Sequence, residues 1–166
     1  MGTVVAGLVA VSMIGMWVYV FVFHLGGSWR DQQPGQMGDP TFALLAEPVC
    51  AATRADLAQL PQAWETTTPA TRADAIAESV VILNDMVVEL STLDVGTEQQ
   101  AVAEWVADWQ AYVNDRADYG RRLRNDVEAR FYVTQSDRDN RQITLAIDKF
   151  AETNAMPSCE TPADLS

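Results

Sequence analysis

The sequence predicts an all-α protein in which one N-terminal transmembrane helix is followed by an antiparallel four-helix bundle. Three observations support this fold class. The run from Thr3 to Phe23 contains no charged side chain. Most of the remaining chain places apolar residues three and four positions apart, which is the period of an amphipathic helix. No stretch alternates with a period of two for long enough to predict a sheet.

The uncharged run from Thr3 to Phe23 predicts a membrane span, because about 20 apolar residues in a helix cross the hydrocarbon core of a bilayer. A cleaved signal peptide typically has basic residues ahead of a shorter apolar core, and Met1 to Thr3 include none. We therefore expect residues 1–25 to form an uncleaved signal anchor. Flanking charges are too few to orient it. The cysteine pair and the acidic remainder favour a cytoplasmic N-terminus and an extracytoplasmic domain.

Residues 26–38 have the composition of a flexible linker, with paired glycines and a Pro34-Gly35 turn signal. Residues 39–166 should form a single domain, since a chain of this length can bury a core of ordinary size. The two cysteines, Cys50 and Cys159, stand near opposite ends of this domain. That placement suits a disulfide that fastens the C-terminal tail, and the alternative is two reduced thiols in a cytosolic domain.

The first two helices of the bundle have similar start signals. Asp39-Pro40 predicts an N-cap and first helical position for a helix from residue 40 to about 59, and Pro48 predicts a kink or short break within it. Thr68-Pro69 predicts a second helix over residues 69–93. The second helix carries a heptad-like apolar seam at Ile76, Val80, Leu83, Val87 and Leu90.

Two further helices complete the predicted bundle. The capping-box pattern of residues 97–100 starts a long third helix that runs to about Val127. A fourth helix is expected from about Asp137 to Asn154. The inward face of the third helix is predicted at Val102, Trp105, Val106, Trp109, Tyr112, Val113, Tyr119 and Leu123. The fourth helix should bury Ile143, Ala146, Ile147, Phe150 and Ala151.

Composition and motifs exclude several classes of function. The formal net charge of −12 opposes binding to nucleic acid. The one histidine, His24, lies at the edge of the predicted anchor, which removes most zinc, haem and catalytic-triad arrangements. No phosphate-binding loop, nucleophile elbow or calcium loop is present. We therefore predict no catalytic residue, no metal site and no cofactor, and expect a protein that is not an enzyme.

Three groups of residues are candidates for ligand or partner contacts. Trp105, Trp109 and Tyr112 form an aromatic stripe that would suit a sugar or peptide groove, although helical spacing favours the core. Asn84 lies beside the apolar seam, either as a polar register residue or as a ligand contact. Seven of the 11 lysines and arginines fall between residues 116 and 141. These include Arg121, Arg122 and Arg124, which either form a patch for an anionic partner or are neutralised by interleaved aspartates.

The sequence resembles membrane-anchored extracytoplasmic helical proteins of high-GC Gram-positive (actinobacterial) bacteria. The resemblance rests on the N-terminal anchor and on short stretches at both ends of the domain, namely residues 39–42, 46–50, 147–152 and 154–159. It implies that Cys50 and Cys159 pair, and it transfers no catalytic residue.

These observations favour a non-enzymatic interaction or accessory module of the cell envelope that contacts a protein partner, as a subunit of a membrane complex. An alternative from another class is a small-ligand-binding or sensory bundle with a pocket between helices near Trp105, Trp109 and Asn84.

Overall fold

The computed structural model describes residues 16, 35–62, 65–136 and 140–163. The chain divides into two compact units, Met1–Gln33 and Pro34–Ser166, and every described residue except Met16 belongs to the second. The predicted anchor therefore lies outside the described residues, Met16 excepted. Within the described ranges, no helix combines the length and the apolar character needed to cross a membrane.

The second unit is all-helical across its described residues, which confirms the predicted all-α class. Only an isolated bridge between Gln135 and Gln142 has β geometry there. The elements in chain order are α2 (Thr41–Leu57), α3 (Pro69–Thr92), α4 (Gln99–Leu123), α5 (Ile143–Thr153) and a short 3₁₀ helix, η2 (Pro157–Cys159).

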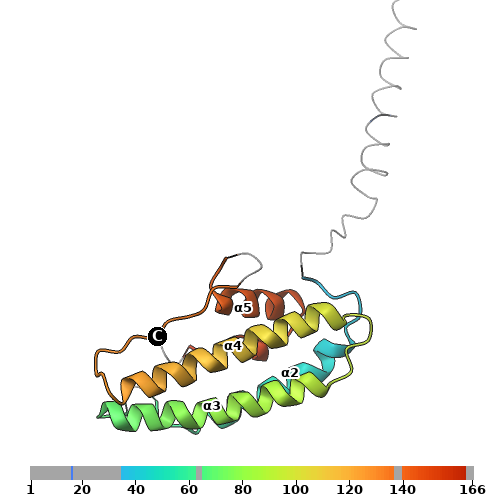
Figure 1. Cartoon of the computed structure of the whole chain (residues 1–166). Helices are drawn as coiled ribbons and strands as arrows, with labels where there is room; N and C mark the ends of the chain where they lie inside the picture. Colours follow the sequence, from blue (N-terminus) through green and yellow to red (C-terminus); the bar gives the residue numbers. More distant parts are fainter. Residues whose placement is uncertain (1–15, 17–34, 63–64, 137–139, 164–166) are drawn as a thin grey trace, which may run out of the picture. The chain divides into compact units, whose positions relative to one another are not determined.

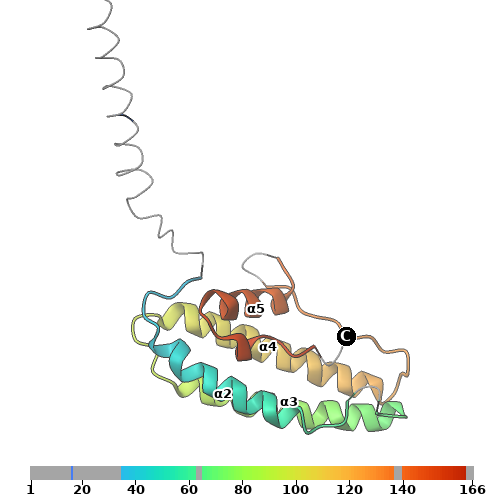
Figure 2. The ribbon, with the colours of Figure 1, turned by 180° about the vertical axis from the view of Figure 1, so that it is seen from behind.

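The long helices α3 and α4 form a hairpin around which the other elements are arranged (Figure 1). α2 packs on α3, α5 packs on α4, and η2 contacts both α2 and α5. Seen from behind, α2 and the C-terminal segment lie in front of the hairpin (Figure 2). The bundle core therefore lies between one side of the hairpin and these shorter elements.

The starts of α2 and α3 follow the predicted local signals closely. Thr68 and Thr71 form a reciprocal capping box, in which the Thr71 amide donates to Thr68 Oγ1 at 3.1 Å and the Thr68 amide donates to Thr71 Oγ1 at 3.3 Å. Asp39 Oδ1 accepts from the Thr41 amide at 2.9 Å, where α2 begins. Each helix thus begins within one residue of its predicted start.

The predicted capping box at Thr97 is wrong. α4 begins at Gln99 without a side-chain cap, and the carboxylate of Glu98 accepts a hydrogen bond from the Gly38 amide at 3.0 Å instead. This contact comes from residues 35–38, which the sequence assigns to the linker. Met37 is only 8% exposed, so these residues already pack against the helices.

The predicted break at Pro48 does not occur, because α2 runs without interruption from Thr41 to Leu57. A proline removes the hydrogen bond to the carbonyl four residues earlier, which here belongs to Leu44. Pro48 is exposed and Leu44 is 73% exposed. The freed carbonyl therefore lies on a side of the helix that water can reach, and the helix tolerates the loss.

The third and fourth helices are shorter than predicted. α4 ends at Leu123 rather than near Val127, and α5 begins at Ile143 rather than near Asp137. Backbone pairing replaces helix just before α5, since the Ser136 amide donates to the Arg141 carbonyl at 2.7 Å. The Ile143 amide likewise donates to the Thr134 carbonyl at 2.9 Å. Periodicity alone could not distinguish this paired segment from a first helical turn.

The core contains the predicted inward face of α4 with one exception, Val106, which is half-buried. The rings of Trp105 and Trp109 do not stack but meet edge to face, with their centroids 6.3 Å apart. This edge-to-face arrangement is one that aromatic quadrupoles favour. At Gly120 of α4, an added Cβ would lie 3.1 Å from Ile76 Cγ2 of α3. This glycine therefore allows the two hairpin helices to approach closely.

Candidate functional site

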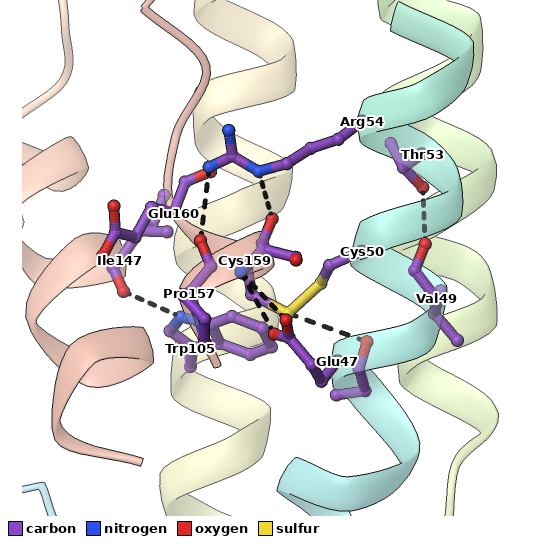
Figure 3. The surroundings of a disulfide bond; sticks show 12 residues. Glu47, Val49, Cys50, Thr53, Arg54, Trp105, Ile147, Pro157, Cys159 and Glu160 are labelled. Atoms are coloured by element: carbon purple, nitrogen blue, oxygen red, sulfur yellow. Dashed lines mark hydrogen bonds between the residues drawn. A yellow bond between two sulfur atoms is a disulfide. The ribbon is translucent and has the colours of Figure 1, made fainter. Parts of the chain in front are cut away.

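The C-terminal tail is fastened to α2 by a disulfide and by polar contacts around it (Figure 3). Cys50 and Cys159 are bonded with their Cα atoms 5.1 Å apart, and neither is exposed, which confirms the predicted pair. The side chain of Arg54 reaches from α2 to the tail, where Nε donates to the Ser158 carbonyl at 2.6 Å and Nη2 donates to the Glu160 carbonyl at 2.9 Å. Glu47 accepts from the Ser158 amide at 3.1 Å. The tail is thus an integral part of the bundle.

The predicted aromatic stripe lies in the core. Trp105, Trp109 and Tyr112 are each 1% exposed. Trp105 Nε1 donates to the Ile147 carbonyl at 3.2 Å, and its ring stacks on Phe150 of α5 at 5.2 Å. The structure therefore places all three rings in the core, where Trp105 packs α4 against α5.

Asn84 lies elsewhere, half-buried on α3. The structure brings Trp105, Trp109 and Tyr112 together, and neither Asn84 nor the three candidate arginines joins them in that cluster.

The candidate arginines near the end of α4 lie beside aspartates. Asp118 forms ion pairs with Arg122 at 2.6 Å and with Arg121 at 3.3 Å. The hydrogen bond from Arg122 is the main cause that lowers the pKa of Asp118 below its ordinary value of 3.8. Arg124 pairs with Asp74 of α3. In these contacts each of the three candidate arginines is paired with an aspartate, which is the second of the two alternatives given for this segment.

A groove between α3 and α4 offers a surface that the sequence analysis did not single out. It has a volume of about 510 Å³, and all of its lining residues are uncharged although a fifth of the chain is charged. We call it the hairpin groove. Its lining residues are Val87, Val88, Leu90, Ser91, Val95, Gln99, Val102, Ala103, Val106, Ala107 and Gln110.

Acidic side chains lie close in sequence to residues of the hairpin groove. Asp85 and Glu89 are exposed on α3, and Glu104 lies on α4 one residue from Ala103 of the groove. Val88 is 56% exposed between them, and Val81, two turns earlier on α3, is 60% exposed. The groove is therefore an uncharged and partly exposed surface on an acidic protein.

Arg116 is a buried cation that the sequence analysis counted only as part of the arginine-rich segment. It follows Tyr112 by four residues and so continues the inward face of α4, a signal that could have identified it. The side chain is 0% exposed, with Nη1 donating to Tyr112 Oη at 3.1 Å and Nη2 donating to Ser79 Oγ at 2.8 Å. These contacts connect α4 to α3 near the end of the bundle.

Among the described residues, no group of three or more histidine, cysteine, aspartate or glutamate side chains is placed to hold a metal ion. Comparison of the chain with protein-family models, with curated proteins and with solved structures finds no match.

Proposed function

We propose that this protein is a non-enzymatic interaction module of the cell envelope, with residues 1–25 as a single membrane span and the N-terminus in the cytoplasm. In this proposal residues 26–38 lead to an extracytoplasmic helical domain over residues 39–166. The uncharged run from Thr3 to Phe23 supports the span. The disulfide between Cys50 and Cys159 supports an oxidising compartment, because structural disulfides are rare in the cytosol.

The observation that carries the interaction role is the hairpin groove. α2, α5 and η2 pack on the core side of the hairpin, and Val88, Ala103 and Ala107 remain exposed at the groove. An uncharged surface of this kind, bordered by polar residues, typically marks a site of protein association. Two adjacent helices with small side chains between them suit a third helix, whose side chains fit between theirs.

The charges around the groove specify the partner. The groove lining is uncharged, and the whole chain carries a net charge of −12. A second copy of this chain would carry the same net negative charge, which is unfavourable for association. The occupant that fits is a helix of another envelope protein, with an uncharged ridge of small or aliphatic side chains and arginine or lysine residues on either side of it.

The direct test uses a photoreactive crosslinking residue at Ala107 in the full chain, expressed in its native membrane. We expect a crosslink to one protein, mapped by mass spectrometry to a helix with basic flanks. Substitution of Val88 by arginine adds bulk and positive charge at the groove and should reduce recovery of that protein at least about tenfold, the effect of roughly 1.4 kcal/mol.

Leu145→Arg is the matched control, because Leu145 is 55% exposed on α5 and Val88 is 56% exposed on α3. Both variants should keep the far-ultraviolet circular dichroism of the parent. Equal loss of the partner in both variants, or recovery of the chain from native membranes as a monomer alone, would contradict the interaction role.

The membrane topology needs a separate measurement. In intact cells the full chain should remain in the membrane fraction after carbonate extraction, and a membrane-impermeant thiol reagent should label Cys50 and Cys159 only after reduction. Detection of both thiols as free in freshly prepared cells would contradict the extracytoplasmic location.

A further inference from the structure

Residues 35–39, which precede α2, lie against the end of the bundle where α3 turns into α4 (Figure 1). The Glu98 carboxylate accepts a hydrogen bond from the Gly38 amide at 3.0 Å. An added Cβ at Gly96 would lie 2.6 Å from Asp39 Oδ2, so the turn and the segment before α2 are in close contact. The chain therefore enters the domain beside the turn between α3 and α4.

The side-chain amide of Asn154, directly after α5, holds the same segment. Its Oδ1 accepts from the Met37 amide at 2.8 Å, and its Nδ2 donates to the Gly35 carbonyl at 2.9 Å. Met37 is 8% exposed, so its side chain also belongs to the core. The folded domain therefore includes Gly35, which leaves residues 24–34 between the proposed membrane span and the fixed part of the chain.

The hairpin groove begins next to this junction. Val95 and Gln99 line one end of the groove. They are adjacent in sequence to Gly96 and Glu98, the two residues that contact the segment before α2. From Gln99 to Gln110 the groove follows α4 for about 16 Å, at about 1.5 Å per residue. The groove therefore extends for about three helical turns from the point where the chain enters the domain.

The length of residues 24–34 limits how far the groove can be from the bilayer in the proposed topology. A fully extended chain spans at most about 3.5 Å per residue, so this stretch reaches about 40 Å. A partner that occupies the groove must therefore bind within a limited distance of the membrane surface.

The hairpin groove is small for a site that captures a freely diffusing protein. Eleven residues line it, whereas an interface of standard size has about 20 to 30 residues on each side. A contact of this size gives weak binding unless the two proteins are held close together. Attachment of both proteins to one membrane does this, because it raises the effective concentration of each at the other.

We infer that the partner is a second membrane-anchored protein, in which a helix just outside its own membrane span occupies the hairpin groove. This inference rests on the interaction role proposed for the groove and adds the class of protein that fills it. A helix that continues from a span rises about 1.5 Å per residue, so about 27 residues cover 40 Å. The groove-binding helix should therefore lie within about 30 residues of the partner's span.

The test changes the length of the tether and leaves the groove intact. A stiff proline-rich segment of about 15 residues is inserted after Gln33, the last residue of the first compact unit. It adds about 45 Å, at about 3.1 Å per residue. The same segment added after Ser166 is the matched control, because it leaves the tether unchanged. Both full chains carry the photoreactive residue at Ala107, are expressed in the native membrane and should keep the circular dichroism of the parent.

We expect the insertion after Gln33 to lower the crosslink yield at Ala107 at least about tenfold. A stiff spacer that no longer matches the distance to the site removes most of the effective concentration. The addition after Ser166 should leave the yield unchanged. The crosslinked peptide should map within about 30 residues of a membrane span in the partner.

The possible failures separate this inference from the interaction role. An unchanged yield after the insertion at Gln33, or a crosslinked protein without a membrane span, would overturn the inference and leave the interaction role standing. An equal loss of yield in both chains would assign the effect to the added segment and would also overturn the inference. The absence of any crosslink in the parent chain would contradict the interaction role and the inference together.

Discussion

At the scale of single residues, Trp105 makes the contacts that join three of the helices. The centroid of its ring lies 5.9 Å from that of Phe42 in α2 and 5.2 Å from that of Phe150 in α5. Its indole N–H donates a hydrogen bond to the Ile147 carbonyl. The residue is 1% exposed, so its contacts are made almost entirely within the protein. Its role in this fold is packing.

Trp105→Ala should lower the free energy of unfolding by about 3 to 5 kcal/mol, because it leaves a large cavity in the core. Urea denaturation followed by far-ultraviolet circular dichroism measures this change without depending on tryptophan fluorescence. Leu145→Ala, at an exposed position, should stay within about 0.5 kcal/mol of the parent. A comparable loss in both variants would contradict the packing role.

The ion pair of Asp118 with Arg122 gives a prediction about pH. Because the folded-state pKa of Asp118 is lowered below 3.8, its stabilising contribution is present above that pH and is lost as the pH falls through the lowered folded value. NMR titration of the Asp118 carboxyl carbon should show a pKa that moves back toward 3.8 in Arg122→Gln. Arg121→Gln should move it less, since the hydrogen bond from Arg122 is the larger cause. An unchanged pKa in Arg122→Gln would contradict the assignment.

At the scale of elements, the starts of α3 and α4 differ in how their first amides are satisfied. α3 has a complete capping box from Thr68, with Pro69 at its first turn. α4 begins after Glu98 with no side-chain cap, although Thr97 and Gln100 have the residue types and spacing of a capping box. A capping-box sequence is therefore not sufficient for a capping box, and at α4 the Glu98 carboxylate accepts from the Gly38 amide of a distant segment.

Thr68→Ala should destabilise the protein by about 1 kcal/mol, the usual effect of removing an N-cap side chain. Thr97→Ala removes a threonine from the equivalent sequence position without removing a cap, and it should change stability by less than about 0.5 kcal/mol. Chemical denaturation of both variants under the same conditions compares them. Equal effects would show that the capping box of α3 contributes nothing measurable.

At the scale of the whole molecule, the helical unit has its own core and closes its own tail. Both sulfur atoms of the disulfide are within it, and α2 through η2 pack on one another. A unit with this organisation should fold without the residues that precede it.

A chain of residues 34–166 should show the helical circular dichroism and the cooperative unfolding expected of one domain. An equivalent chain with Trp105→Ala should unfold at a lower urea concentration, which confirms that the same core forms. Non-cooperative unfolding of the parent fragment would mean that residues 1–33 are needed for folding.

Reduction of the disulfide should lower stability by up to about 4 to 5 kcal/mol in the chain-entropy model, because the closed loop has a sequence separation of 109. Hydrogen exchange should then accelerate first in the tail around η2. Arg54→Gln in the oxidised chain is the comparison, since it removes the polar contacts and keeps the covalent one. Unchanged tail protection after reduction would show that the polar contacts suffice.

The helical class, the start of α3, most of the core face of α4 and the two cysteines suited to a disulfide could all be predicted from the sequence. These features depend on interactions between residues a few positions apart, or on a period that the apolar residues repeat. For the same reason the sequence located the starts of α2 and α3 to within one residue.

Three features became clear only from the folded structure: the end of α4 and the start of α5, the tolerance of Pro48 within α2, and the pairing of charged side chains. It showed that Arg54, Arg72 and Arg116 line one cavity, and it confirmed the core position that helical spacing favoured for Trp105, Trp109 and Tyr112. It also showed an uncharged groove between α3 and α4. These features depend on residues far apart in the chain, whose proximity follows from packing and leaves no local pattern in the sequence.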